Sequence, residues 1–334
     1  MSRDGECISY EMYRSLRTSQ ARITSPLTYL RLSRGLGESI PVSVLTELLS
    51  CLGNVERLSC QVQFYGVGAS GHLNESEIEA FVFDVASSLR GLEELDADFK
   101  QFYVYTAVRK FMFLLDTRRI GGVLIRDFVS SKILEELFSL RGGAQPSSNW
   151  FSLASTTTVY TRYIDMDVDG DGMLSREEMT KYPCAMFTKV AIDRIFQEHM
   201  TFEGMLDYKG YLDLVLALEN PSSQVSIKYM WKLLDVHKKG VLDFSDIVPF
   251  LKAIMDTLHV TVPTAGYCMY KPDNIFREFL DSLGILDRDF LQVEDLIEGS
   301  KNGLHVCPML IDGQAFYQHD NREHTFTAHT QTAN

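Results

Sequence analysis

The sequence has no long apolar run, no cluster of basic residues and no Cys-x-x-Cys pair. No apolar run approaches the roughly 18 residues that a membrane-spanning helix needs, and the first residues offer no apolar core for a signal peptide. The formal net charge is -13 without any Lys/Arg-rich run, so the sequence predicts neither a nucleic-acid nor a membrane partner. The 6 cysteines are scattered, and we expect free thiols in a reducing, cytoplasmic compartment.

Common signatures of catalysis are also missing. The sequence has no His-Glu-x-x-His zinc-protease motif, no phosphate loop, no nucleophile elbow and no Cys–His nucleophile set. A chain of 334 residues, 45% hydrophobic and 23% charged, suffices for two globular domains. The sequence therefore predicts a binding protein rather than an enzyme, and turnover of a phosphopeptide by the purified chain would revive the enzyme alternative.

Residues 167–178 satisfy each position of the twelve-residue EF-hand calcium loop. Carboxylates occupy positions 1, 3 and 5, a glycine stands at position 6 where the loop turns sharply, and a glutamate closes position 12. Position 7 contributes its backbone carbonyl, so all ligand atoms are oxygens, which suit the hard ion Ca²⁺. An acidic solvated turn would not explain Gly172, Leu174 and Glu178 in register. The predicted calcium ligands are Asp167, Asp169, Asp171, Met173, Ser175 and Glu178.

The same helix-loop-helix pattern recurs along the chain with poorer ligands. The stretches 66–77, 116–127, 199–210 and 235–246 keep a glycine at position 6 and an apolar residue at position 8, but lack acidic ligands at several positions. We expect these loops to hold no ion. Short strands of EF-hand loops satisfy each other's backbone hydrogen bonds. The predicted partner of 167–178 is therefore 199–210, and a weak copy at 284–295 is the predicted partner of 235–246.

Two of these stretches allow another interpretation. Gly66, Gly68 and Gly71 spell the Gly-x-Gly-x-x-Gly dinucleotide fingerprint, but that motif needs a helix starting among the glycines. Asn74 instead resembles an N-cap, which places the helix after them. His237 suggests zinc, yet no second His or Cys stands at ligand spacing, which favours a surface histidine.

The repeats predict an all-α protein with tandem EF-hand and degenerate EF-hand pairs in two lobes. An N-terminal arm covers 1–39, and a degenerate EF-hand lobe covers 40–141. Turn formers concentrate in a linker at 142–148. The second domain, at 149–316, contains the calcium loop, and the polar tail 317–334 is expected to be disordered.

Blocks between the repeats resemble one family, the B″ (B-double-prime) regulatory subunits of protein phosphatase type 2A, and its gamma-type branch above all. The resemblance covers roughly 40–325, whereas the residues before about 40 do not match. Gly66 stands where an acidic residue is common in that branch. The blocks are residues 102–111, 149–152, 206–209, 213–220, 229–235, 310–312 and 321–323.

The resemblance implies a non-catalytic subunit that docks on the helical-repeat scaffold of the phosphatase and directs the separate catalytic subunit to its substrates. It also implies an association with centrosomal and cortical microtubules, and it carries the family's calcium site onto the six ligands above. A stand-alone EF-hand calcium sensor or adaptor is the alternative. Absence of phosphatase subunits from a pull-down would favour that alternative.

Overall fold

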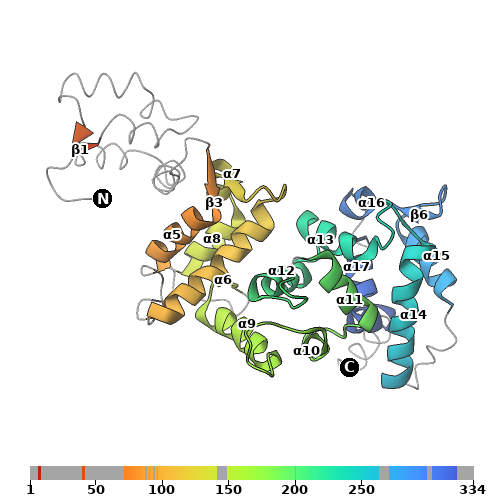
Figure 1. The fold of residues 1–334 in the computed structure, drawn as a ribbon. Helices are drawn as coiled ribbons and strands as arrows, with labels where there is room; N and C mark the ends of the chain where they lie inside the picture. The colour runs from red at the N-terminus through yellow and green to blue at the C-terminus, as the bar shows by residue number, and fades with distance from the viewer. Residues whose placement is uncertain are drawn as a thin grey trace, which may run out of the picture. The chain divides into compact units, whose positions relative to one another are not determined.

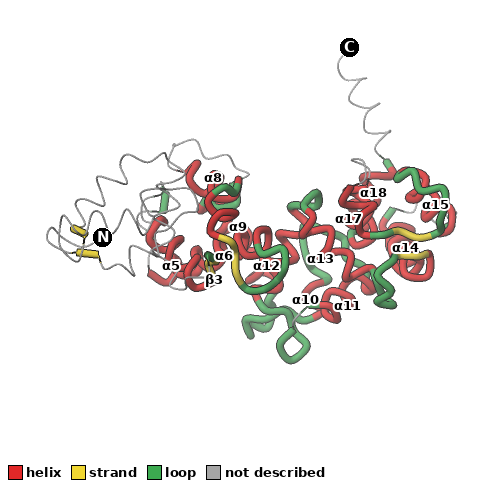
Figure 2. Tube along the Cα trace, turned by 90° about the horizontal axis from the view of Figure 1, so that it is seen from above, coloured by secondary structure: helices red, strands yellow, loops and turns green. Residues whose placement is uncertain are grey.

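The structure is a computed structural model that describes residues 7–8, 40–41, 71–140 apart from 87–88, 90, 93–94 and 96, and then 149–199, 201–262, 271–298 and 303–321. Helices dominate the described residues, and the few strands are two or three residues long (Figures 1 and 2). This confirms the all-α prediction. Within the described residues, no helix combines the length and apolarity needed to cross a bilayer.

The chain divides into two compact units, Met1–Thr157 and Thr158–Asn334. In the first unit, β1 (Cys7–Ile8) pairs antiparallel with β2 (Ile40–Pro41), so two residues of the predicted N-terminal arm form a strand. Most of that arm lies outside the described residues. The remaining elements of this unit are β3 (His72–Asn74), α5 (Glu75–Ala86), α6 (Ala97–Leu115), β4 (Gly122–Leu124), α7 (Ile125–Val129) and α8 (Lys132–Ser139).

The described part of loop 66–77, from Gly71 onward, pairs with loop 116–127 through β3 and β4. These strands are antiparallel, and Leu73 lies opposite Val123, so position 8 of one loop faces position 8 of the other. Asn74 Oδ1 accepts from Glu77 N at 2.9 Å, and Asn74 N donates to Glu77 Oε2 at 2.8 Å, which caps α5 at the predicted residue. The dinucleotide interpretation is wrong, because β3 stands between Gly71 and the helix, which begins only at Glu75.

Aromatic packing fixes where the first unit ends. Phe111 lies 5.4 Å from Phe151 between ring centroids, and Tyr103 donates its hydroxyl to the Phe151 carbonyl at 2.8 Å. Trp150 is buried and donates Nε1–H to the Thr106 carbonyl at 3.3 Å. Residues 149–157 therefore belong with the first unit, and the division lies beyond the predicted linker, residues 142–148, which fall outside the described residues.

The second unit consists of helices joined by paired loops. α9 (Leu153–Met166) enters it across the division. α13 contacts α11, α12, α16 and α17, which places it in the core. The elements that follow α9 are α10 (Arg176–Met179), α11 (Lys189–Glu198), α12 (Tyr208–Glu219), α13 (Gln224–Leu234), β5 (Leu242–Asp243), α14 (Phe244–Thr261), α15 (Pro272–Ser282), β6 (Phe290–Leu291), α16 (Val293–Glu298), α17 (Gly303–Ile311) and α18 (Gly313–Asp320).

Both predicted loop pairings in this unit are present. Leu174 and Leu206 exchange two backbone hydrogen bonds of 2.8 Å, which joins loop 167–178 to loop 199–210. β5 pairs antiparallel with β6, and Leu242 lies opposite Leu291, which joins loop 235–246 to loop 284–295. All four leucines are fully buried. Position 8 of each loop therefore serves both as a strand residue and as a core residue.

Two further contacts organise this unit. The buried Arg194 of α11 donates to the Leu233 carbonyl at 2.8 Å and to the Lys232 carbonyl at 2.9 Å, so a cation caps the C-terminus of α13. Residues 317–320 continue α18 into the predicted disordered tail, which corrects the start of that segment. Its later part, 322–334, lies outside the described residues.

Candidate metal centre

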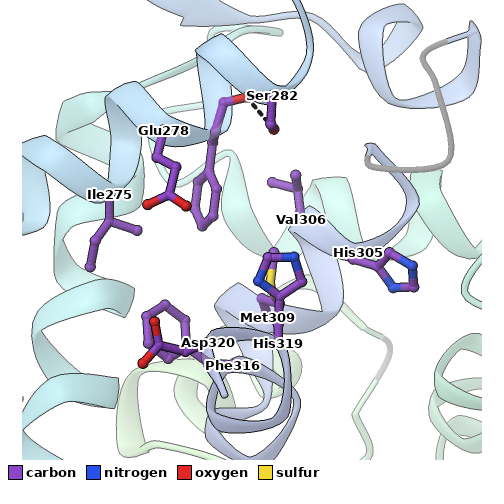
Figure 3. A pocket seen from close by; sticks show the side chains of 10 residues that line it. Ile275, Glu278, Ser282, His305, Val306, Met309, Phe316, His319 and Asp320 are labelled. Atoms are coloured by element: carbon purple, nitrogen blue, oxygen red, sulfur yellow. Dashed lines mark hydrogen bonds between the residues drawn. The ribbon is translucent and has the colours of Figure 1, made fainter. Parts of the chain in front are cut away.

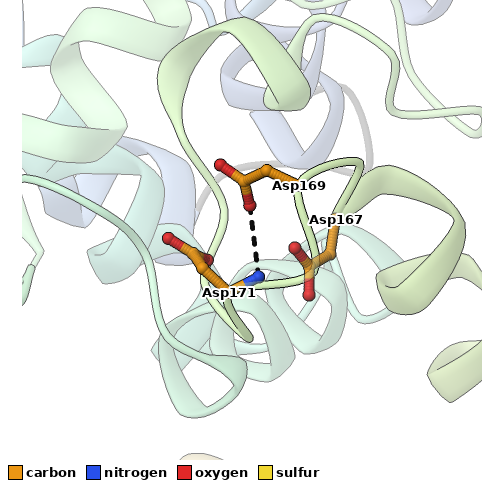
Figure 4. Close-up of side chains that lie close together, drawn as sticks. All are labelled: Asp167, Asp169 and Asp171. Atoms are coloured by element: carbon orange, nitrogen blue, oxygen red, sulfur yellow. Dashed lines mark hydrogen bonds between the residues drawn. The ribbon is translucent and has the colours of Figure 1, made fainter.

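Three of the six predicted ligands come together in the structure. The carboxylates of Asp167, Asp169 and Asp171 lie within 4.8 Å of one another (Figure 4). Among the described residues, no other group of three His, Cys, Asp or Glu side chains is gathered in this way. Asp167 Oδ1 is buried and has no hydrogen-bond partner. A buried carboxylate oxygen without a donor is costly, so this site fits a bound cation.

The loop backbone holds these carboxylates in place. Asp167 Oδ2 accepts from Gly172 N at 3.0 Å, Asp169 Oδ1 accepts from Asp171 N at 3.2 Å, and Asp171 Oδ1 accepts from Met173 N at 2.7 Å. Gly170 and Gly172 have φ values of 70° and 81°, which L-residues rarely adopt. The two glycines let the chain turn around the acidic centre.

Tyr163 of α9 supports the loop in a way that the sequence did not reveal. Its hydroxyl donates to the Gly172 carbonyl at 2.7 Å. Burial, together with the nearby carboxylates of Asp167, Asp207 and Asp171, raises the pKa of this hydroxyl, so it stays a neutral donor. The helical spacing of Tyr163 indicated only a core position, and a hydrogen bond to a loop carbonyl has no separate sequence signal.

Ser175 and Glu178 are paired with each other rather than gathered with the aspartates. Glu178 Oε2 accepts from Ser175 N and from Ser175 Oγ, both at 2.8 Å, and Oε1 accepts from Val168 N at 2.7 Å. Burial opposes the charge of Glu178, but these hydrogen bonds outweigh it and keep the pKa below its usual value. Glu178 therefore lies outside the group of gathered carboxylates, and its oxygens are engaged by Val168 and Ser175.

Loop 235–246 shows what replaces a metal ion in a degenerate copy. Lys239, at position 5, places Nζ 2.8 Å from Asp246 Oδ2 and also against the Asp243 carboxylate. His237 Nδ1 lies 2.5 Å from Asp246 Oδ1. Hydrogen bonds to Asp243 and Asp246 raise the pKa of Lys239, so it remains charged. The ammonium group thus neutralises carboxylates that a calcium ion would otherwise bridge.

In the first unit, the carboxylate at position 1 of a degenerate loop is held by backbone N–H groups. Asp116, at position 1 of loop 116–127, accepts from Ile120 N at 3.0 Å and from Gly121 N at 2.8 Å. Asp235 makes the same two contacts, with Lys239 N and Gly240 N, both at 2.9 Å. Position 1 is therefore satisfied by its own loop backbone in both degenerate copies.

Comparison with known proteins identifies the family. No protein-family model matches the chain. The B″ subunit gamma of phosphatase 2A from Xenopus tropicalis is 38% identical over 266 residues, which is 78% of this chain and 58% of that protein. The chain is a homologue of the B″ regulatory subunits. The human gamma subunit is 37% identical over the same length, and the probable B″ subunit TON2 of Arabidopsis thaliana is 26% identical over 318 residues, 90% of this chain and 65% of that one.

A solved structure agrees with this assignment. One chain of a solved PP2A PR70 holoenzyme superposes on this B″ homologue with a TM-score of 0.66. The match covers 80% of this chain and 98% of that chain at 18% identity, so it shows a shared fold. The B″ homologue spans 58% of the length of the gamma subunits that it matches.

Proposed function

We propose that this B″ homologue is a calcium-binding, non-catalytic regulatory subunit that docks on the phosphatase 2A scaffold and directs the catalytic subunit to substrates or sites. The relatives that match it are named regulatory subunits, not catalytic ones. The observation that carries the calcium part is the acidic centre of Asp167, Asp169 and Asp171, with an unpartnered buried oxygen.

The proposed response to calcium is a local rearrangement around Glu178. This residue sits in α10 and forms a capping box with Ser175. When its carboxylate turns toward the aspartates, the cap of α10 changes while the Leu174–Leu206 bridge holds the rest of the loop. If the phosphatase assembly prefers the calcium-bound arrangement, calcium and partner binding strengthen each other by the same factor.

Reconstitution tests the proposal most directly. The purified chain is mixed with phosphatase scaffold and catalytic subunits, with calcium or with a chelator, and the complex is measured by size-exclusion chromatography. We expect a ternary complex that forms more tightly with calcium. A calcium-binding chain that captures neither subunit would instead be the stand-alone sensor or adaptor. A calcium Kd of about 10⁻⁷–10⁻⁵ M would indicate a sensor, whereas tighter binding would indicate a structural ion.

The proposed location is the cytoplasm, at the centrosome or the cortical cytoskeleton, as the family resemblance implies. Fluorescence microscopy of the tagged chain with a tubulin marker tests this. We expect overlap with microtubule-organising sites, and a uniform distribution that nocodazole leaves unchanged would count against it.

A further inference from the structure

Arg176, the first residue of α10, connects loop 167–178 to the next helix of the chain. Its Nε lies 3.4 Å from Asp193 Oδ1 of α11, and its guanidinium group lies over the Phe196 ring, 4.7 Å from the centroid. Asp193 and Phe196 are three positions apart, so they share one face of α11, and the Phe196 side chain is buried. An ion pair and a cation–π contact therefore hold α10 against that face.

The residue after Asp193 connects α11 to α13 instead. Consecutive residues do not share a helix face, so Arg194 points away from α10. Its buried guanidinium group donates to three backbone carbonyls at the end of α13 and pairs with Glu198 at 3.0 Å. The same Glu198 oxygen lies 3.5 Å from Lys238 Nζ in loop 235–246. Helix α11 is thus fixed to α10 on one face and to α13 on another.

We propose that α11 carries the calcium state of loop 167–178 to the end of α13, with Arg176 and Arg194 as the positioning residues. This inference rests on the proposed calcium function. Glu178 belongs to α10 and lies outside the gathered carboxylates, so an ion that recruits Glu178 displaces α10. Packed helices transmit a displacement because the interior is close-packed. The end of α13 therefore shifts when calcium binds, provided that Arg176 keeps α10 attached to α11.

The proposed connection leaves out the cavity of the second unit. This cavity has a volume of about 310 Å³ and is lined by residues of α15, α17 and α18 (Figure 3). None of these lining residues belongs to α10, α11 or α13. A calcium response at the end of α13 is therefore expected without any ligand in the cavity.

Trp231 is a natural reporter for this response. It is buried in the last turn of α13, and its carbonyl accepts from Asp235 N at 2.9 Å, at the end that Arg194 caps. The chain has 2 tryptophans, so the full chain labelled with 5-fluorotryptophan gives two ¹⁹F resonances, which the W150F variant assigns. We expect calcium to shift the Trp231 resonance with the same midpoint as the heat of calcium binding in calorimetry.

Variants at Arg176 separate this connection from a purely structural role. Arg176→Ala removes both contacts with α11 and should abolish most of the Trp231 shift while calcium still binds. Arg176→Lys keeps a cation beside Phe196 and should restore part of the shift. Lys181→Ala makes the same charge change at an exposed neighbour and should leave the shift intact.

The possible results distinguish this inference from the calcium function on which it rests. If the parent chain binds calcium without moving the Trp231 resonance, or if Arg176→Ala retains the full shift, the connection through α11 is overturned and the calcium site stands. If calorimetry shows no calcium binding to the parent, both the connection and the proposed calcium function are overturned.

Discussion

Loops 167–178 and 235–246 belong to the same unit and are built on the same backbone plan, yet they neutralise their acids differently. The first gathers Asp167, Asp169 and Asp171 around a centre with no protein cation among them. The second inserts the ammonium of Lys239 between Asp243 and Asp246. In loop 235–246 a side chain thus supplies positive charge to the acids, whereas loop 167–178 gathers carboxylates that fit a metal ion.

Four of the loops share a helix-capping contact made by the acidic residue at position 12. Position 12 is the third residue of the outgoing helix, and its carboxylate accepts from the backbone N–H of position 9. This contact joins Asn74 to Glu77, Ser175 to Glu178, Asp243 to Asp246 and Gln292 to Asp295. In these four loops the acid at position 12 therefore has a capping role that needs no metal ion, so it does not by itself mark a calcium loop, and the ligands at positions 3 and 5 must be read with it.

The largest expected effect comes from Glu178→Gln. The amide keeps one acceptor oxygen, for either Ser175 or Val168, so the fold should persist with a weaker cap, but it lacks the charge and the second ligand oxygen. Even outer partners of metal ligands are worth about 10- to 100-fold in affinity, so we expect calcium binding to weaken by more than about 100-fold. Isothermal titration calorimetry measures this. The matched control is Glu177→Gln at an exposed neighbour, and equal calcium heats in both variants would show that the site is misassigned.

The next prediction converts the degenerate loop into a calcium loop. The double change H237D/K239D places carboxylates at positions 3 and 5, beside Asp235, Asp243 and Asp246. We expect the number of bound calcium ions to rise from one to two. The control is Lys238→Asp at position 4, which is not a ligand position and should leave the number at one. If the double variant still binds one ion, the side-chain cation is not what distinguishes the two loops.

A smaller effect is expected for Gly170→Ala. Gly170 has φ 70°, and a Cβ there would meet no atom within 4 Å, so the cost is conformational only. We expect a loss of about 1 kcal/mol in the free energy of unfolding, measured with urea. Arg119 and Lys238 occupy the same position 4 in the degenerate loops with φ 55° and 54°, so the fold tolerates this cost. A loss of several kcal/mol would mean that the loop is strained elsewhere.

The smallest effect concerns pH and Asp312. Burial raises the pKa of this carboxyl, against the hydrogen bonds from Met186, Gln314 and Ala315. Because the folded-state pKa is above the unfolded value, its stabilising contribution is present at low pH and is lost as the pH rises through the folded pKa. Asn retains the acceptor oxygen without titrating. The stability of D312N relative to the parent should therefore rise between acidic and neutral pH in denaturant titrations, and a constant difference would contradict this.

The sequence predicted the repeats well because position 6 and position 8 carry strong local constraints. A glycine with positive φ and a buried residue in a short strand leave a signal that can be read without tertiary structure, and the Leu174–Leu206 and Leu242–Leu291 pairings followed from it. The unit boundary was less predictable. Burial of Trp150 and Phe151 against α6 depends on contacts with residues more than 40 positions away.

Specific contacts between side chains could not be predicted from the sequence either. Lys239 and His237 at ligand positions indicated an inactive loop, but their contacts with Asp246 depend on rotamers that no pattern specifies. The hydroxyl of Tyr163 and the pairing of Glu178 with Val168 are of the same kind. The pocket between α15, α17 and α18 combines helices whose residues carry no shared motif.

Calcium stoichiometry tests the central claim most directly. Equilibrium dialysis of the purified chain with ⁴⁵Ca²⁺ should give one ion per molecule, and Glu178→Gln should reduce it toward zero at micromolar calcium. Zero ions in the parent would contradict the site at 167–178. Two or more would contradict the conclusion that side chains and backbone replace the ion in the other loops.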